Sequence, residues 1–304
     1  MVIESLKSHK QHYSNLIPLI YNEYSPLTKV LVVKPPEKFT KFNNLSVNPI
    51  DDYNSKGKLI IEEHPEQKEE FNELLNALCK QDVELYYSDV KPGRPGHTPL
   101  FTRDIAIIIG NKVLPSRMAY PYRENEVDGV FDNISPLQIV RDDRDYKIEG
   151  GDFTLLEPNL ALVGIGPRTN KLSLQVLREH FPNIEFIPVY PVLKEKAFHI
   201  DTILGIVGNK ILVGVSDWIP KNVLSLLKNR GYQIIEANKD EYFTCATNVL
   251  AVDDRKVISA AENLKTNEKL RKAGVEVIEV KLSGILKRGG GPRCLTLPLE
   301  RFLL

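Results

Sequence analysis

The stretch DTILGIVGNKILVGV, residues 201–215, decides the fold class of this chain of 304 residues. Two apolar runs rich in β-branched residues flank a short Gly-Asn turn, which is the pattern of a β-hairpin. Residues 220–231, PKNVLSLLKNRG, then place apolar side chains at helical spacing, and residues 232–237, YQIIEA, have the composition of a strand. The stretch therefore predicts a unit built of a hairpin, a helix and a strand.

The same unit recurs along the chain. Hairpin patterns begin at Ile105, Phe153, Thr202 and Asn248, so that successive starts lie 46 to 49 residues apart. The last three hairpins are each followed by a helical pattern and then by a strand pattern. A regular spacing of this kind indicates pseudo-repeated units.

A fifth unit joins the two ends of the chain. Residues 29–35, 66–81 and 82–88 have the patterns of a strand, a helix and a strand, and residues 295–299, LTLPL, are available to close this unit. We therefore predict an α/β fold of five hairpin–helix–strand units closed into a ring, a five-bladed α/β propeller, in one domain over residues 1–304. The alternative, a doubly wound sheet, would alternate single strands with helices, whereas here hairpins recur.

The charge balance and the apolar pattern exclude several classes of protein. Forty basic and forty acidic residues cancel, so nothing marks a general nucleic-acid or membrane surface. The first thirty residues lack the pattern of a secretory signal, and no apolar run has the length needed to span a bilayer. We expect a cytoplasmic protein whose partner is a small molecule, and we leave its oligomeric state open, a homo-oligomer included.

The three cysteines have different surroundings, and their scatter fits neither a disulfide framework nor a zinc site. Cys79 falls on the apolar face of the predicted helix 66–81, which predicts a core position. Cys245 begins a strand-like run and is expected to be a small buried hydrophobic residue. Cys294 instead follows a glycine run in RGGGPRC, which gives a ligand access to the thiol. Cys294 is therefore the candidate nucleophile.

Short polar segments precede the hairpins at equivalent places in the repeat. If the units are equivalent, these segments meet at one end of the ring and collect several carboxylates, one histidine and one thiol. In HID, a spacing of two residues puts His199 and Asp201 on the same side of a predicted strand. The segments are FTRD (101–104), EGGD (149–152), HID (199–201) and CATN (245–248), with GGGPRC (289–294) after the last unit.

This set of residues fits a guanidinium substrate. Carboxylates beside a thiol oppose its ionisation unless the ligand is cationic, and a planar guanidinium donates to carboxylates on several edges while its central carbon stays open to sulfur. Asp104, Glu149 and Asp201 would hold the nitrogens. Cys294 would attack the carbon, and His199 would protonate the departing amine and then activate water. Metal-dependent hydrolysis is a weaker reading, because a single histidine makes a poor metal site, and we predict neither a metal nor another cofactor.

FTRD, EGGD, HID and GGGPRC, in this order, resemble the motifs of the guanidino-modifying enzymes of the pentein superfamily, which include arginine deiminases, dimethylarginine hydrolases and amidinotransferases. The resemblance implies a five-bladed α/β propeller with the active site on its axis. It also implies that Asp104 and Asp201 bind the guanidinium. Glu149 and His199 would form the acid/base pair, and Cys294 would form a covalent amidino intermediate. The further substrate contacts expected from it are Phe101, Arg168, Asn248, Thr98 and Gly291.

Different parts of the chain resemble different members of this superfamily. Residues 266–301 look most like arginine deiminases, so the leading prediction is hydrolysis of L-arginine or a close relative to citrulline and ammonia. Residues 168–170 are closer to dimethylarginine hydrolases, and residues 22–32 resemble amidinotransferases. The alternatives are those two activities and an arginine dihydrolase. A non-catalytic pentein-fold binding protein is disfavoured, because an unused buried cluster of this kind would cost stability.

Overall fold

The computed structural model describes residues 16–33, 41–42, 59–60, 65–90, 99–192 and 199–302. Thr98, an expected substrate contact, lies outside these residues. Within the described ranges, no helix has the length and apolar character needed to cross a membrane. The chain is a mixed α/β protein with several small sheets.

Three sheets of three strands share one topology. In each, an antiparallel pair is followed by a helix and by a third strand that joins the second strand in parallel. They are the predicted hairpin–helix–strand units. The elements are β7 (Phe153–Glu157), β8 (Leu160–Gly164), α5 (Leu172–His180) and β9 (Glu185–Val189); β10 (Leu204–Gly208), β11 (Ile211–Gly214), α6 (Lys221–Asn229) and β12 (Gln233–Glu236); and β13 (Leu250–Asp253), β14 (Lys256–Ala260), α7 (Leu264–Lys272) and β15 (Glu276–Val280).

A fourth sheet of the same design joins the two ends of the chain, as predicted. Strand β1 pairs antiparallel with β16 and, after helix α3, parallel with β4, in the order β16-β1-β4. The C-terminal strand therefore takes the place that the first hairpin strand has in the other units. Its elements are β1 (Leu27–Val33), α3 (Pro65–Cys79), β4 (Glu84–Ser88) and β16 (Leu297–Arg301).

The fifth unit has two strands, β5 (Ala106–Ile109) and β6 (Lys112–Pro115), which form an antiparallel hairpin. A single parallel bridge from Val113 to Ile139 stands where the other units have a third strand. The connection between β6 and Ile139 contains the 3₁₀ helix η2 (Pro121–Val127) and helix α4 (Asp128–Asn133). A short pair, β2 (Lys41–Phe42) with β3 (Leu59–Ile60), lies outside the repeat.

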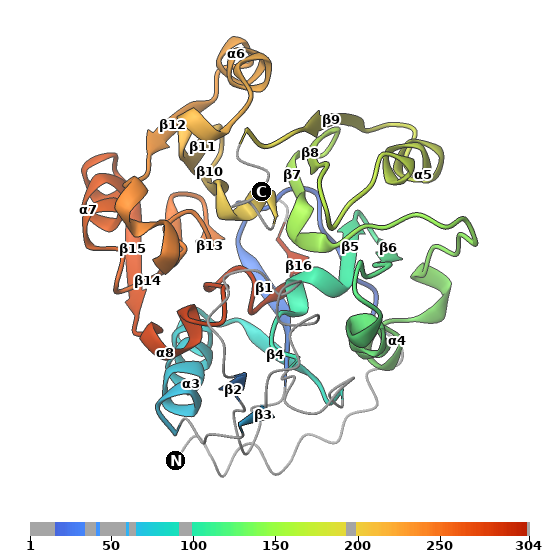
Figure 1. Ribbon diagram of the computed structural model, residues 1–304, viewed down its shortest axis with the longest axis horizontal. Helices are drawn as coiled ribbons and strands as arrows, with labels where there is room; N and C mark the ends of the chain where they lie inside the picture. Colours follow the sequence, from blue (N-terminus) through green and yellow to red (C-terminus); the bar gives the residue numbers. More distant parts are fainter. Residues whose placement is uncertain are drawn as a thin grey trace.

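The sheets surround the centre of the molecule, with α5, α6 and α7 toward its periphery (Figure 1). Apolar side chains between neighbouring units form the core. One buried cluster joins Leu31 of β1, Ile107 of β5, Val163 of β8 and Leu177 of α5. Because each sheet is small, neighbouring units share their apolar faces, and burial of those faces against each other holds the units together.

Cys79 is exposed, so its predicted core position is wrong. The buried side chains of α3 near it are Phe71, Leu74, Leu75 and Leu78. Each residue advances an α-helix by about 100°, and Cys79, the last residue of α3, lies past the edge of this buried arc.

Cys245 is buried, as predicted, but it does not begin a strand. It follows the 3₁₀ helix η7 (Lys239–Thr244) in a left-handed conformation with φ of 56°, and β13 starts only after a further turn. The strand therefore begins at Leu250 and not at Cys245, and the turn between them contains few of the usual turn residues, so the sequence pattern does not mark it.

Candidate active site

The polar segments that precede the hairpins share one local structure. In each, a backbone N–H donates to the carbonyl oxygen three residues earlier, which makes a single tight turn before the first strand of a sheet. The sequence repeat is thus also a repeat of backbone hydrogen bonds. The four bonds join Asp104 N to Phe101 O (3.1 Å), Asp152 N to Glu149 O (3.0 Å), Thr202 N to His199 O (3.2 Å) and Asn248 N to Cys245 O (2.9 Å).

HID lies in such a turn and not in a strand, so this part of the prediction is wrong. The 3₁₀ helix η5 (Ile200–Thr202) follows the extended residue His199, and β10 begins only after it. Both side chains still reach one site. His199 turns toward Asp104, whereas Asp201 turns toward Cys294. The turn therefore assigns the two side chains to opposite halves of the site.

His199 links two of the carboxylates. Its Nε2 lies 2.9 Å from Glu149 Oε2, and its Nδ1 lies 3.6 Å from Asp104 Oδ1. Burial lowers the pKa of His199, but the fields of Asp104, Glu149 and Asp152 outweigh it and raise the pKa to about 9. At neutral pH His199 is therefore an imidazolium, and both ring nitrogens are donors.

Two buried arginines complete the network around Glu149. Arg168 Nη1 donates to Glu149 Oε2 at 2.8 Å. Arg123 Nη1 donates to Asp104 Oδ2 at 3.0 Å and lies 3.5 Å from Glu149 Oε2, while its Nε and Nη2 both bind Glu126 at 2.9 Å. Burial raises the pKa of Glu149, but Arg168, the imidazolium and Arg123 outweigh it and hold this pKa well below its usual range. Glu149 is therefore a carboxylate.

Cys294 lies on the other side of the site, in the loop before β16, where Asn248 holds it. The Asn248 Nδ2 group donates to Sγ at 3.0 Å. Its Oδ1 accepts from the backbone N–H groups of Cys294 (3.0 Å) and Gly291 (3.2 Å). One amide therefore orients both the thiol and the loop that carries it.

Asp201 connects the thiol to a buried arginine. Its Oδ2 lies 3.6 Å from Cys294 Sγ and accepts from Arg293 Nη1 at 2.7 Å. Burial raises the pKa of Cys294 well above its usual range, Asp201 and Asp104 add to the rise, and Arg293 opposes it. The thiol is therefore neutral at neutral pH. A cation between the carboxylates and the sulfur would lower its pKa.

Two glycines allow close packing of the site. A Cβ on Gly151 would lie 2.5 Å from His199 Nδ1 and 2.8 Å from Asp104 Oδ1. A Cβ on Gly290 would lie 2.4 Å from Cε1 of Phe101. The Phe101 side chain is half-buried. The sequence predicts that the glycine run before Cys294, which includes Gly290, gives a ligand access to the thiol. In the structure, Gly151 and Gly290 also let the side chains of the site approach the main chain.

The structure brings together nine of the ten predicted site residues, and Thr98 lies outside the described ones. Arg168 contacts Glu149, and its guanidinium lies over the Tyr120 ring, 4.3 Å from the centroid. Residues that the sequence reasoning missed are Arg123 and Arg293. Arg293 directly precedes Cys294 in GGGPRC, so its position was a usable signal, whereas Arg123 stands at no repeat-equivalent place.

Three of the site residues also have the arrangement of metal ligands. One ligand atom each from Asp104, Glu149 and His199 lie within 4.8 Å of one another. Arg123 and Arg168 already donate to these two carboxylates, and the imidazole is protonated. A metal ion would have to displace these cations, so the donor set as described fits an ion poorly.

Comparison with known proteins decides the family. The model for "N,N dimethylarginine dimethylhydrolase, eukaryotic" matches residues 35–301. The chain belongs to this family. It is therefore a guanidino-group-modifying enzyme of the pentein superfamily, as the sequence motifs predicted.

Proteins related to this family member by sequence carry different names. The uncharacterized protein YkgA of Bacillus subtilis is 34% identical over 282 residues, which cover 92% of this chain and 94% of YkgA. The arginine deiminase of Listeria welshimeri is 28% identical over 251 residues, covering 66% of this chain. The match spans only 61% of that deiminase, so the chain accounts for less than two thirds of its length.

Solved structures share the fold of this family member at low identity. The N-terminal domain of ArgZ, a cyanobacterial arginine dihydrolase, has a TM-score of 0.74 at 19% identity and covers 91% of this chain and 99% of that domain. SxtG, an amidinotransferase from Microseira wollei, has a TM-score of 0.72 at 18% identity, with 94% and 98% covered. DDAH from Pseudomonas aeruginosa has a TM-score of 0.70 at 20% identity, with 91% and 100% covered.

Proposed function

We propose that this chain is a thiol-dependent hydrolase that acts on the guanidine group of L-arginine or of an Nω-methylated arginine. Citrulline is the product, and ammonia or a methylamine is released. The matching family model supports hydrolysis of a guanidine, and the sequence relation to arginine deiminases supports an arginine skeleton. We further propose that the five units form the blades of one propeller domain with this site at its centre.

The observation that carries the proposal is a pair of buried carboxylate oxygens. Oδ1 of Asp104 and Oδ1 of Asp201 are buried without a hydrogen-bond partner among the described residues. The second oxygen of each is held by an arginine of the chain, Arg123 or Arg293. Buried acceptors without donors are costly, and a planar cation with several N–H groups satisfies both at once. A guanidinium bound there also has its carbon beside Cys294.

The charges of the site suit the first half of the reaction. A bound guanidinium offsets the carboxylates that raise the thiol pKa, so Cys294 releases its proton to solvent and ionises when the substrate is present. The thiolate forms a bond to the guanidine carbon, and the C–N bond to the departing amine then breaks. His199, already protonated and held by Glu149, gives its proton to that amine.

His199 also acts in the second half of the reaction. Once it has given up its proton, His199 is a neutral base beside the amidino intermediate. It takes a proton from water, and the hydroxide oxygen adds to the carbon. The C–S bond then breaks with return of the thiolate, and the hydroxyl proton leaves to solvent as the C=O bond forms. Citrulline leaves, and no metal or other cofactor takes part in these steps.

The amino-acid end of the substrate needs a cation for its carboxylate. Arg168 is buried, its guanidinium lies over the Tyr120 ring, and its Nε has no hydrogen-bond partner among the described residues. We propose that Arg168 binds the carboxylate, with Arg123 as the second cation of this region. Both contact Glu149, so substrate binding and orientation of the acid/base pair are coupled.

The test is incubation of the purified protein with L-arginine and, separately, with Nω,Nω-dimethylarginine, with citrulline, ornithine, ammonia and dimethylamine measured. Citrulline with one equivalent of amine supports the proposal and identifies the substrate. Ornithine with two equivalents of ammonia would replace it by a dihydrolase reaction. Absence of turnover with both compounds and with agmatine would contradict it.

An amidinotransferase is the second candidate, because the likeness to SxtG extends over 94% of this chain. Both reactions share the amidino intermediate on Cys294 and differ in whether water or an amine accepts the group. Arginine with added glycine distinguishes them. Formation of ornithine that depends on the added amine would favour the transferase.

A further inference from the structure

The side chain of Arg103 has an unpaired guanidinium edge in the interior of the protein. Arg103 is 6% exposed, and its Nε and Nη2 are buried without a hydrogen-bond partner in the part of the chain that the structure describes. These two groups form the edge of a guanidinium that binds anions with two parallel N–H bonds. Buried arginine donors are rarely left unpaired, so this edge indicates a bound partner.

The carboxylate nearest to Arg103 is already engaged. Glu23 lies 3.5 Å from Arg103 Nη1, but it takes closer bonds from Arg293, at 3.0 and 3.2 Å, and from the Leu155 backbone N–H at 3.0 Å. One carboxylate therefore serves two buried guanidinium groups. The positive charge of Arg103 is the less compensated of the two, which is unfavourable in a low-dielectric interior.

Arg103 remains a cation in this setting. Burial and Arg293 lower its pKa to about 10, against the fields of Glu23, Asp201 and Cys294. A pKa of about 10 leaves the guanidinium protonated at neutral pH. Deprotonation therefore does not relieve the buried positive charge of Arg103, and a negative charge nearby is needed to compensate it.

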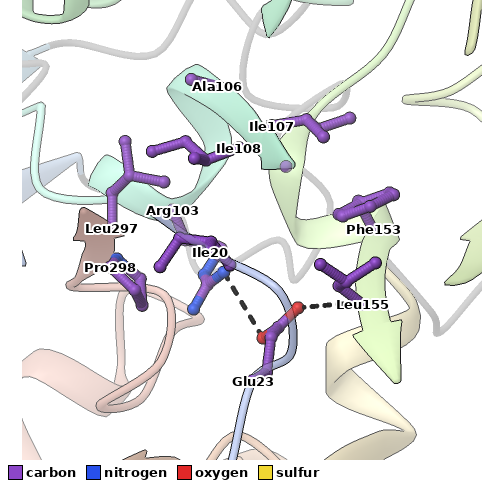
Figure 2. A pocket seen from close by; sticks show the side chains of 11 residues that line it. Ile20, Glu23, Arg103, Ala106, Ile107, Ile108, Phe153, Leu155, Leu297 and Pro298 are labelled. Atoms are coloured by element: carbon purple, nitrogen blue, oxygen red, sulfur yellow. Dashed lines mark hydrogen bonds and ion pairs between the residues drawn. The ribbon is translucent and has the colours of Figure 1, made fainter. Parts of the chain in front are cut away.

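A cavity beside Arg103 offers a place for the balancing group (Figure 2). It has room for about one water-sized body. Apart from Arg103 and Glu23, its lining is backbone and apolar side chains, among them Ile107, Phe153 and Leu297. The carboxylate of Glu23 is already bound by Arg293 and by the Leu155 backbone N–H, so the donors left free at this wall belong to the edge of Arg103. One cationic edge among apolar side chains favours a compact, weakly hydrated ion over a group with many donors and acceptors.

We propose that the Nε and Nη2 edge of Arg103 binds a small monovalent anion of halide size in this cavity. The cavity is not lined by Asp104 or Asp201, and the proposal does not depend on the reaction proposed above. The site is nevertheless linked to the nucleophile, because the Arg103 backbone N–H donates to the Cys294 carbonyl oxygen at 3.2 Å. A single water molecule bound to the same edge is the competing occupant.

Bromide in crystals of the unaltered protein tests the site directly. We expect an anomalous bromide peak within hydrogen-bond distance of Arg103 Nε and Nη2. An ordered water at this position, with no anomalous signal at high bromide, would overturn the proposal.

Thermal unfolding in solution provides a second test. At constant ionic strength, replacement of gluconate by chloride or bromide should raise the melting temperature, and Arg103→Met should abolish this response. Arg301→Met is the matched control: Arg301 is also a buried arginine, but its Nη1 and Nη2 donate to the Ser25 and Ala251 carbonyl oxygens, and it does not line the cavity. This variant should melt lower and keep the halide response. An equal response in parent and Arg103→Met would overturn the proposal.

Glu23→Gln keeps the test decisive if Arg103→Met does not fold. Removing the negative charge of Glu23, which lines the cavity, should tighten halide binding by about tenfold, since like charges in one small cavity repel each other strongly in a protein interior. Halide affinity that is unchanged or weaker in Glu23→Gln would contradict an anion at Arg103.

Discussion

The two halves of the candidate site, Asp104 with His199 and Asp201 with Cys294, each contain a buried carboxylate, but the carboxylate has opposite effects on the neighbouring group. Asp104 and Asp201 each have one oxygen bound to a buried arginine of the chain and one oxygen without a hydrogen-bond partner among the described residues. Beside Asp104 lies an imidazolium, and beside Asp201 lies a neutral thiol. A carboxylate favours the charged form of a base and disfavours that of a thiol. The acid, His199, is therefore protonated before the substrate binds, whereas the nucleophile, Cys294, ionises only when a cation is bound.

The largest effect should come from loss of the thiol. Cys294→Ala is expected to abolish turnover, while the fold and guanidine binding persist, because Asp104 and Asp201 remain in place. Turnover by product assay and binding by calorimetry measure the two properties. Cys79→Ser is the matched control at an exposed thiol and should retain full activity. Turnover by Cys294→Ala would remove the proposed nucleophile.

Asp201→Asn breaks the Asp201 half. Turnover should fall by at least about 100-fold, since a preorganised electrostatic contact is lost. The field that raises the thiol pKa is also reduced, so alkylation of Cys294 by iodoacetamide at pH 8 should become faster than in the parent. The melting temperature should fall only in part, because Asn keeps an oxygen that can accept from Arg293 Nη1 while the charge of the buried pair is lost. A large loss of stability without faster alkylation would make Asp201 a structural residue.

Asp104→Asn breaks the other half and should act on the acid. In the parent, His199 is protonated below its raised pKa, so turnover should decline as the pH rises through about 9. Asp104 contributes the largest upward field at this imidazole, and its neutralisation should move the decline to lower pH. The pH dependence of turnover measures this. The same high-pH limit in parent and variant would separate Asp104 from His199.

The smallest expected effect concerns Asp152, which lies behind the Asp104 half. Burial raises its pKa from 3.8 to about 7, with Glu149 adding to the rise and His199 opposing it. A raised carboxyl pKa means that the folded state prefers the protonated form, so stability is lost as the pH rises toward and through 7. Asp152→Asn removes this loss and retains an oxygen for the Ile200 backbone N–H. Its melting temperature should exceed that of the parent by about 2–4 °C at pH 8.

The control for this prediction is the same pair of proteins at lower pH. The difference between Asp152→Asn and the parent should shrink between pH 8 and pH 5, because Asp152 becomes protonated in the folded parent. A difference that does not change with pH would assign the effect to packing.

The sequence determined the repeat and the composition of the site. Hairpins, helices and third strands follow from apolar periodicity, which depends on local geometry and can be read residue by residue. The strand 295–299 was expected to close the first unit, and β16 does so beside β1. Most candidate residues stand in the polar segments that precede the hairpins or in GGGPRC, whereas Arg168 and Thr98 follow from the family resemblance. Only Thr98 among them lies outside the described residues.

Only the tertiary structure decided how these residues are paired and charged. Arg293 and Asp201 come from different units, and Arg123 reaches Asp104 from the irregular connection after β6, so no local pattern encodes either pair. The exposure of Cys79 and the 3₁₀ turn at HID likewise depend on how an element meets its neighbours. Protonation follows from burial together with the nearest charges, so it requires three-dimensional distances. The sequence thus names the chemical groups, and the fold sets which of them are ionised.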